Sequence, residues 1–218
     1  MRLLTALMLS LSLPSVGAGL VAAPALAQEA SATGLAQVEN HLRQVKSLQA
    51  DFTQIADTGA VAKGKMILAK PGRIRFDFGK DSPLLIVSNG SVLSMVDYDV
   101  SQVTRWPVKD TPLALLLDDK VSLAGKARLL PQNETPAGFV AVEGRDAKRP
   151  EYGTITLYFQ KNTKGPAGLT LMGWRVLDGQ GRTTTVQLEN QRLNEEVASS
   201  SFQFKDPRAT GTSRPGRR

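Results

Sequence analysis

Side chains that could perform acid–base, nucleophilic or metal chemistry are few in this sequence of 218 residues. It has one histidine, His41, and no cysteine, which excludes thiolate nucleophiles and cysteine-ligated metals and argues against a Ser-His-Asp triad. We interpret the adjacent carboxylates Asp118-Asp119 and Glu195-Glu196 as solvated charges, because neighbouring side chains usually diverge in direction. The chain also lacks a glycine-rich phosphate loop and the G-x-S-x-G and S-x-x-K motifs. We therefore expect a protein that is not an enzyme and uses no cofactor and no metal.

The net charge of +7 would at first suggest a nucleic acid or an anionic membrane as partner. Residues 205–218 alone carry a net charge of +4, however, and residues 28–204 only +2. The segment Arg73–Phe78 alternates charged and apolar side chains, which could form a stacking strip for nucleic acid bases. We favour a strand with one buried and one solvated face, and we expect no nucleic acid partner.

Residues 1–27 have the pattern of a cleaved secretory signal peptide. Arg2 precedes an apolar run, Leu3–Leu13, and Ala25-Leu26-Ala27 fits a cleavage site. An uncleaved membrane anchor is the alternative, since residues 3–23 carry no charge. We expect an exported protein with a single domain over residues 28–207 and a basic, disordered tail over residues 208–218. Without cysteine the chain cannot carry a lipoprotein's lipid anchor.

The remaining pattern predicts a short helical part and many strands. Apolar residues recur at helical spacing over residues 33–48, with His41 off or at the border of that stripe, where we expect it to be satisfied or exposed. Alternation then predicts strands near 51–55, 65–69, 74–78, 84–88, 92–96, 101–106, 127–130, 138–143, 154–160, 169–177, 183–190 and 201–204. Asn89-Gly90 predicts a hairpin with a type I′ turn. Thr111-Pro112 predicts the N-cap and first residue of a second helix, apolar on every face.

We therefore expect a mostly β fold with few helices. About ten or eleven strands joined by short turns favour an antiparallel, meandering sheet that curls, either into a closed barrel filled by its own side chains or into a larger, incomplete one. An incomplete barrel leaves a void that a helix or a ligand must occupy, and the two apolar helices are available to cover it.

Several segments, in this order and spacing, resemble the outer-membrane lipoprotein carrier protein (LolA) family. They are Phe52-Thr53-Gln54, Gly64-Lys65, Lys70 to Phe76, Ile86 to Gly90, Thr111-Pro112-Leu113 and Phe202-Gln203-Phe204 before Pro207. The resemblance spans roughly residues 34–207. It implies an open antiparallel barrel whose apolar concave face is covered by helices. It also implies a monomeric carrier of triacylated lipoproteins in the periplasm of a Gram-negative bacterium. Such a carrier takes them from an inner-membrane lipoprotein-releasing ABC transporter to an outer-membrane acceptor or to the outer membrane directly.

The resemblance also implies a set of site residues. Lys70 stands where the family has an arginine that holds the helical lid shut by bonding to its backbone, and lysine lacks the planar, multiply donating guanidinium. Apolar residues that match the cavity lining and the lid are Leu42, Leu68, Ile74, Phe76, Phe78, Leu113, Leu115, Leu116 and Leu117. The alternative for Lys70 is a plain surface lysine, and for the apolar residues ordinary core packing.

Other functions are compatible with the same fold. One is a periplasmic sensor of lipids or lipoproteins similar to the regulator RseB, although such regulators carry a second domain. Another is a carrier of a different lipid, because an apolar wall does not distinguish acyl chains. The membrane-anchored acceptor LolB is disfavoured by the missing cysteine.

Overall fold

The structure is a computed structural model that describes residues 23–145 and 149–210, with side chains described for 33–145 and 149–208. Most of the expected signal peptide and residues 211–218 of the expected tail therefore lie outside the described residues. Within the expected tail, residues 208–210 belong to a 3-10 helix that starts at Pro207. Helix α1 (Ala23–Gln44) begins before the expected cleavage site after Ala27.

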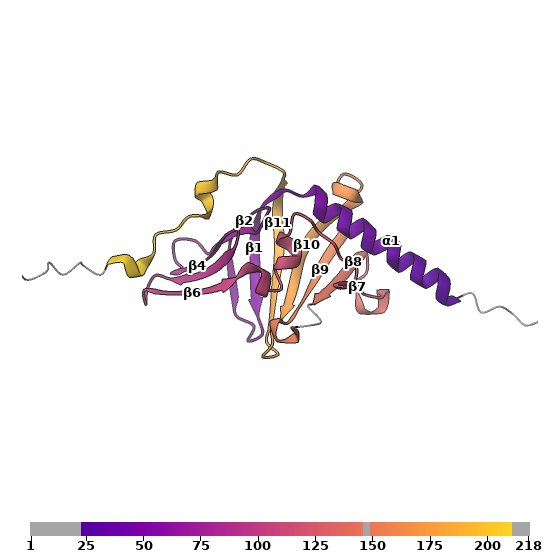
Figure 1. Cartoon of the computed structure of the whole chain (residues 1–218), viewed down its shortest axis with the longest axis horizontal. Coiled ribbons are helices and arrows are strands. Elements are labelled where there is room, and N and C mark those ends of the chain that lie inside the picture. Colours follow the sequence, from indigo (N-terminus) through magenta and orange to yellow (C-terminus); the bar gives the residue numbers. More distant parts are fainter. Residues whose placement is uncertain (1–22, 146–148, 211–218) are drawn as a thin grey trace, which may run out of the picture.

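Eleven antiparallel strands form one open sheet, as the sequence predicted (Figure 1). The strands are β1 (Ser47–Ala56), β2 (Val61–Ala69), β3 (Arg73–Asp77), β4 (Leu84–Asn89), β5 (Val92–Asp97), β6 (Gln102–Pro107), β7 (Ala127–Leu129), β8 (Phe139–Arg145), β9 (Thr154–Lys161), β10 (Leu169–Leu177) and β11 (Thr183–Leu193). Their spatial order is β6-β5-β4-β3-β2-β1-β11-β10-β9-β8-β7. The chain thus starts at the middle of the sheet, runs to one edge, crosses to the other edge and returns beside β1.

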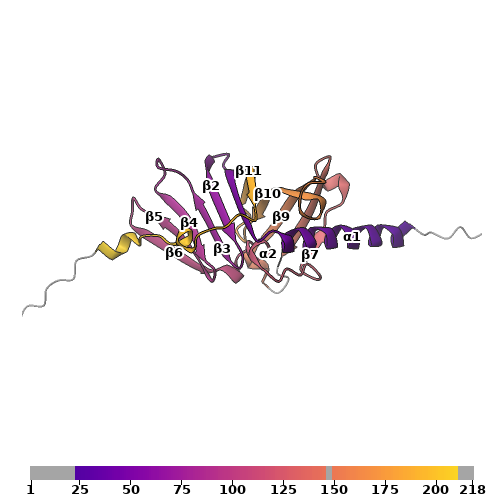
Figure 2. The same ribbon diagram turned by 90° about the horizontal axis from the view of Figure 1, so that it is seen from above.

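Two helices cover one face of this sheet, and the end of the chain covers part of the other. Helix α1 lies along the half of the sheet that contains β7 to β10, and the four-residue helix α2 (Ala114–Leu117) lies in the crossing from β6 to β7 (Figures 1 and 2). The segment after β11, with 3-10 helices η5 (Ser199–Phe202) and η6 (Pro207–Thr210), runs along β2 to β6 (Figure 2). Its Phe202 packs with Ala69, Leu85, Val87 and Val96 on the convex face.

The first helix begins at Ala23, before the predicted start at residue 33, and it ends earlier than its apolar spacing predicted. Gln44 is its last residue, and Leu48, which continues the helical spacing, lies in β1 opposite Leu68 of β2 and Leu193 of β11. The side chain of Asn194 accepts hydrogen bonds from the backbone N–H groups of Lys46 and Ser47. Pairing with strands on both sides therefore outweighs the helical periodicity.

Three other local predictions were wrong. The β4–β5 hairpin exists, but its turn is not type I′, because its two-residue loop is Gly90-Ser91 and only Gly90 has a positive φ. The Asn89 side chain accepts from the backbone N–H groups of Ser91 and Val92. Helix α2 has Leu113 at its N-cap, since the Thr111 hydroxyl donates to Val108 O and closes the 3-10 turn η1 (Val108–Asp110) instead. The expected strand at 201–204 is occupied by the end of η5 and an irregular segment.

Candidate functional site: an apolar trough filled by two helices

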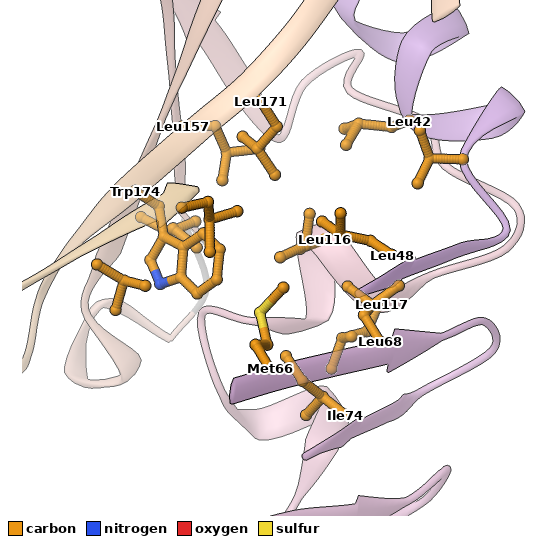
Figure 3. Packing of buried hydrophobic residues seen from close by; sticks show 14 of the residues in the cluster. Leu42, Leu48, Met66, Leu68, Ile74, Leu116, Leu117, Leu157, Leu171 and Trp174 are labelled. Carbon is orange, nitrogen blue, oxygen red and sulfur yellow. The ribbon is translucent and has the colours of Figure 1, made fainter. Parts of the chain in front are cut away.

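The main hydrophobic cluster lies between the concave face of the sheet and the two helices. Strands β1, β2 and β3 contribute one wall, strands β9, β10 and β11 the opposite wall, and α1 and α2 lie between them (Figure 3). Alternation along each strand explains the wall, because Ile74 and Phe76 face the cluster while their neighbours Arg73, Arg75 and Asp77 face the other side.

The structure brings all of the predicted apolar site residues together. Leu42, Leu68, Ile74, Phe76, Leu116 and Leu117 are buried members of this cluster, and Phe78, Leu113 and Leu115 are partly buried and packed against it. Whether they bind lipid stays a prediction, but their shared position in one cluster is a property of the fold.

Two aromatic residues that the sequence analysis did not select lie at the centre of the trough. The ring of Phe52 contacts those of Phe76 and Phe78 edge to face, with centroids 5.3 and 5.2 Å apart. The indole of Trp174, on the opposite wall, stands 6.2 Å from the Phe76 ring and so joins the two halves of the sheet. The alternation of apolar residues in β1 and β10 could have indicated that Phe52 and Trp174 face inward. The contact between Phe76 and Trp174 was not predictable, because β3 and β10 are far apart in the sequence.

Helix α2 fills the middle of the trough with its own side chains. Leu116 and Leu117 are 3% and 1% exposed, and they lie among residues of both walls (Figure 3). Backbone contact fixes the end of the helix, because the N–H of Gly72 in the β2–β3 turn donates to Leu117 O at 2.9 Å. Gly72 has a φ of +70°, and a Cβ atom there would collide with Gly90 O. Glycine therefore allows the β2–β3 turn and the β4–β5 turn to lie close together.

Lys70 contacts the first helix. Its Nζ donates to Leu42 O at 2.5 Å, in the last turn of α1, where carbonyl groups lack partners within the helix. Lys70 is only 9% exposed, and burial, followed by repulsion from Lys46, lowers its pKa from 10.5 to about 8. The predicted latch residue therefore bonds to backbone of a covering helix, but to α1 and not to α2.

His41 is buried, contrary to its expected position beside the apolar stripe. Its Nδ1 donates to Pro166 O at 2.8 Å, and its ring meets Phe159 edge-on at 5.2 Å. Burial is the main cause that lowers its pKa below 6.5, so the ring is neutral near pH 7. The histidine is thus satisfied by a backbone carbonyl, as one of the two expectations had it.

Further polar contacts hold α1 over the trough. Glu39 accepts from the N–H of Leu123, and Arg43 donates to Val121 O, which joins the helix to the segment between α2 and β7. On its other side, Gln37 donates to Ala167 O in the β9–β10 connection. These contacts reach backbone atoms of loops, so they position the helix without adding polar groups to the apolar interior.

The trough is closed and filled in this state. The cavity between Leu42, Lys70 and Leu116 measures about 10 Å³, which is room for no more than one water molecule. Two larger cavities, of about 450 and 520 Å³, lie on either side of α2. A ligand can therefore enter the trough only if the helices move, and α2 has space beside it.

The concave face extends beyond the helices onto the outer strands. The register pairs Trp106 of β6 with Leu93 of β5, a member of the trough cluster, so Trp106 and Met95 share its face. Both side chains are exposed, Trp106 at 41% and Met95 at 37%. One end of the apolar face is thus open to solvent.

The carboxylate pairs 118–119 and 195–196 are exposed, as predicted. Within the described residues no group of three or more histidine, cysteine, aspartate or glutamate side chains could hold a metal ion. The helices of the described part of the chain include none that is long and apolar enough to cross a membrane.

Comparison with known proteins agrees with this geometry. Residues 43–205 match the family model of the outer membrane lipoprotein carrier protein LolA. The chain is 29% identical over 203 residues to the outer-membrane lipoprotein carrier protein of Chromobacterium violaceum, covering 89% of this chain and 94% of that protein. It is 30% identical over 190 residues to that of Methylococcus capsulatus, covering 83% and 88%. It also shares 37% identity over 87 residues with an uncharacterized protein of Rickettsia prowazekii, covering 40% of this chain and 41% of that protein.

Proposed function

The chain belongs to the outer-membrane lipoprotein carrier protein (LolA) family, and on this premise we propose that it is a periplasmic carrier of lipoproteins. It binds the acyl chains of triacylated lipoproteins released by an inner-membrane ABC transporter. It then delivers them, as a monomer, to an outer-membrane acceptor or to the outer membrane directly. Residues 1–27 are the signal peptide in this proposal, and cleavage after Ala27 leaves Gln28 as the first residue of α1.

The observation that carries the proposal is an apolar trough that two helices fill with their own side chains. Exposing an acyl chain to water costs about 0.8 kcal/mol per CH₂ group, hence on the order of 10 kcal/mol for a long chain. An apolar trough removes that cost, and Leu116 and Leu117 already show that it accepts aliphatic groups. Ligand and lid compete for the same surface, so net affinity stays moderate and the cargo can be released.

Lys70 has the role of a positioning residue in this proposal. Its bond to Leu42 O holds the end of α1 against the β2–β3 turn and so favours the closed state. Replacement by leucine removes this bond, loosens the lid and should retain cargo that the wild-type protein passes on.

A release assay with a lockable lid tests the function. Spheroplasts that make a tagged outer-membrane lipoprotein receive the purified protein, and the soluble fraction is examined for the tagged lipoprotein bound to it. A Cβ atom at Gly144 would stand 3.6 Å from Leu115 Cγ, close to where a cysteine sulfur would lie. The double variant Leu115→Cys, Gly144→Cys therefore places a disulfide between α2 and β8 in a chain that has no other cysteine.

We expect stoichiometric release by the wild-type protein and by the reduced double variant, and little release by the oxidised one. The single variant Leu115→Cys controls for the loss of the leucine, and it should be insensitive to oxidant. Absence of release by folded wild-type protein, with a cognate transporter present, would contradict the carrier function and favour a sensor or a carrier of another lipid. Release by the oxidised variant would show that α2 need not move.

A further inference from the structure

We propose that the cavity on the β8 side of α2 is a second binding site, for lipids with a negatively charged headgroup. This cavity, of about 450 Å³, falls within the usual size of small-molecule sites. It lies between α2, the start of β9, the end of β8 and the segment before β7. The site adjoins the trough cluster, with which it shares Leu115, Val121 and Ile155, and the inference does not depend on lipoprotein transport.

The floor of the cavity is apolar. It is lined by Leu115 of α2, by Val121 in the segment before β7, and by Ile155 of β9. Val121 and Ile155 are buried members of the trough cluster, and Leu115 is packed against that cluster. Because Val121 and Ile155 are only 1% exposed, the apolar surface open to a ligand comes from the partly exposed residues Pro112, Ala114 and Leu115, and it suits an aliphatic chain better than a free inorganic ion.

The rim of the cavity is cationic. Among the described residues, Lys109, Lys126, Arg145 and Arg149 line it, against one lining carboxylate, that of Asp118. These cations come from separate segments of the chain, so the fold and not a local run of basic residues brings them together. A carboxylate or phosphate at the rim would meet several positive charges in a partly enclosed space, where attraction is stronger than in bulk water.

One of these cations is held in a fixed position. Arg149 donates to Asp110 at 2.7 Å, and its guanidinium stacks over the Tyr152 ring at 4.6 Å from the centroid. The pair ties η1 to the 3-10 helix η3 (Pro150–Tyr152) across the mouth of the cavity. The cationic rim is therefore partly organised before a ligand arrives, which lowers the entropic cost of binding.

An apolar floor with a cationic rim is complementary to an anionic amphiphile. The acyl chain would lie over Pro112 and Leu115, and the charged head would lie among Lys109, Lys126 and Arg145. A zwitterionic lipid of the same chain length offers the same apolar surface but no net charge, and it should bind more weakly. The preference between two such lipids is the property to measure.

The test compares lysophosphatidylglycerol with lysophosphatidylcholine of equal chain length, both below their micelle concentrations, by titration calorimetry on protein purified from the full-length gene product. We expect about tenfold tighter binding of the anionic lipid at low salt, and a much smaller preference at high salt because exposed charges are screened. Equal affinities for the two lipids, or a preference that salt leaves unchanged, would overturn the proposal. This measurement needs no variant.

A charge-reversal pair locates the preference. Lys126→Glu combined with Arg145→Glu changes two exposed rim residues and leaves the Arg149–Asp110 pair intact. The control, Lys63→Glu with Lys161→Glu, makes the same charge change at exposed positions that do not line the cavity. We expect the preference to vanish in the first variant and to persist in the control. Equal losses in both would assign it to the overall charge of the protein and refute the site.

Discussion

At the scale of single residues, Lys70 makes the stability of the protein depend on pH. The pKa of Lys70 is about 8 in the folded state and 10.5 unperturbed, because burial disfavours the charged amine. Between these values the unfolded chain binds the proton more tightly, so the free energy of unfolding should rise as pH increases from about 8 to 10.5. The full difference is on the order of 3 kcal/mol.

Urea unfolding at a series of pH values checks this dependence. The variant Lys70→Leu should lack the rise, and Lys70→Arg, whose guanidinium stays charged, should lack it too while keeping a donor for Leu42 O. The comparison separates titration from loss of the hydrogen bond. A rise of equal size in the wild type and in Lys70→Leu would assign the titration to other groups.

Single residues also show what local pattern can and cannot reveal. Strict alternation identified Ile74 and Phe76 as inward-facing, because the period of a strand fixes the face of each side chain. The burial of His41 was not predictable, since the carbonyl that satisfies it belongs to Pro166 in a distant connection. The bond from Lys70 to Leu42 O was not predictable either. The Leu42 carbonyl is available because α1 ends at Gln44, before β1 begins, and the apolar spacing did not indicate that end.

At the scale of elements, α2 should act as a removable filler. Leu117→Ala should lower the free energy of unfolding by about 2–5 kcal/mol and, because the lid then competes less, should raise the affinity for an apolar fluorescent probe severalfold. The matched control is Leu85→Ala. Leu85 is buried to a similar extent but belongs to the separate hydrophobic cluster on the convex face. It should cost comparable stability without affecting the probe. Equal probe binding by both variants would indicate general loosening.

The segment after β11 should stabilise the sheet without taking part in lid movement. Phe202 is buried on the convex face under the guanidinium of Arg73, 5.2 Å from its ring. We expect Phe202→Ala to lower the unfolding free energy by about 3 kcal/mol in urea titration. Gln203→Ala leaves the backbone carbonyl that accepts from Arg75 in place, and it should change stability by less than about 0.5 kcal/mol. A silent Phe202→Ala would mean that the segment is not bound to the sheet in solution.

Elements were predictable where one local signal decided them. Eleven of the twelve predicted strand regions needed only alternation and turns, whereas the end of α1 and the cap of α2 depended on competition. Leu48 fits the helix by spacing but pairs with two strands, and Thr111 fits an N-cap but closes the preceding 3-10 turn. The segment 201–204 alternates like a strand, yet its first two residues end the 3-10 helix η5 and its last two are irregular, while Phe202 packs on the convex face of the sheet.

At the scale of the whole molecule, the sheet is open because its first and last strands in the spatial order, β6 and β7, are joined by the crossing that contains α2 and not by a ladder. The meander within each half followed from short turns. The pairing of β1 with β11, which unites the halves, involves residues far apart in sequence and left no local sign. That pairing brings Phe76 and Trp174 together across the trough.

The contact between the two walls provides an internal reporter of cargo. The chain has two tryptophans, so Trp106→Phe leaves Trp174, which is 2% exposed inside the trough (Figure 3). If acyl chains replace the helix leucines between the walls, a triacylated peptide with brominated chains should quench most of the Trp174 fluorescence by contact. The unbrominated peptide at the same occupancy is the control and should quench little. Bound brominated peptide that leaves Trp174 unquenched would place the chains outside the trough, on the exposed outer face near Met95 or in the cavity beside β8.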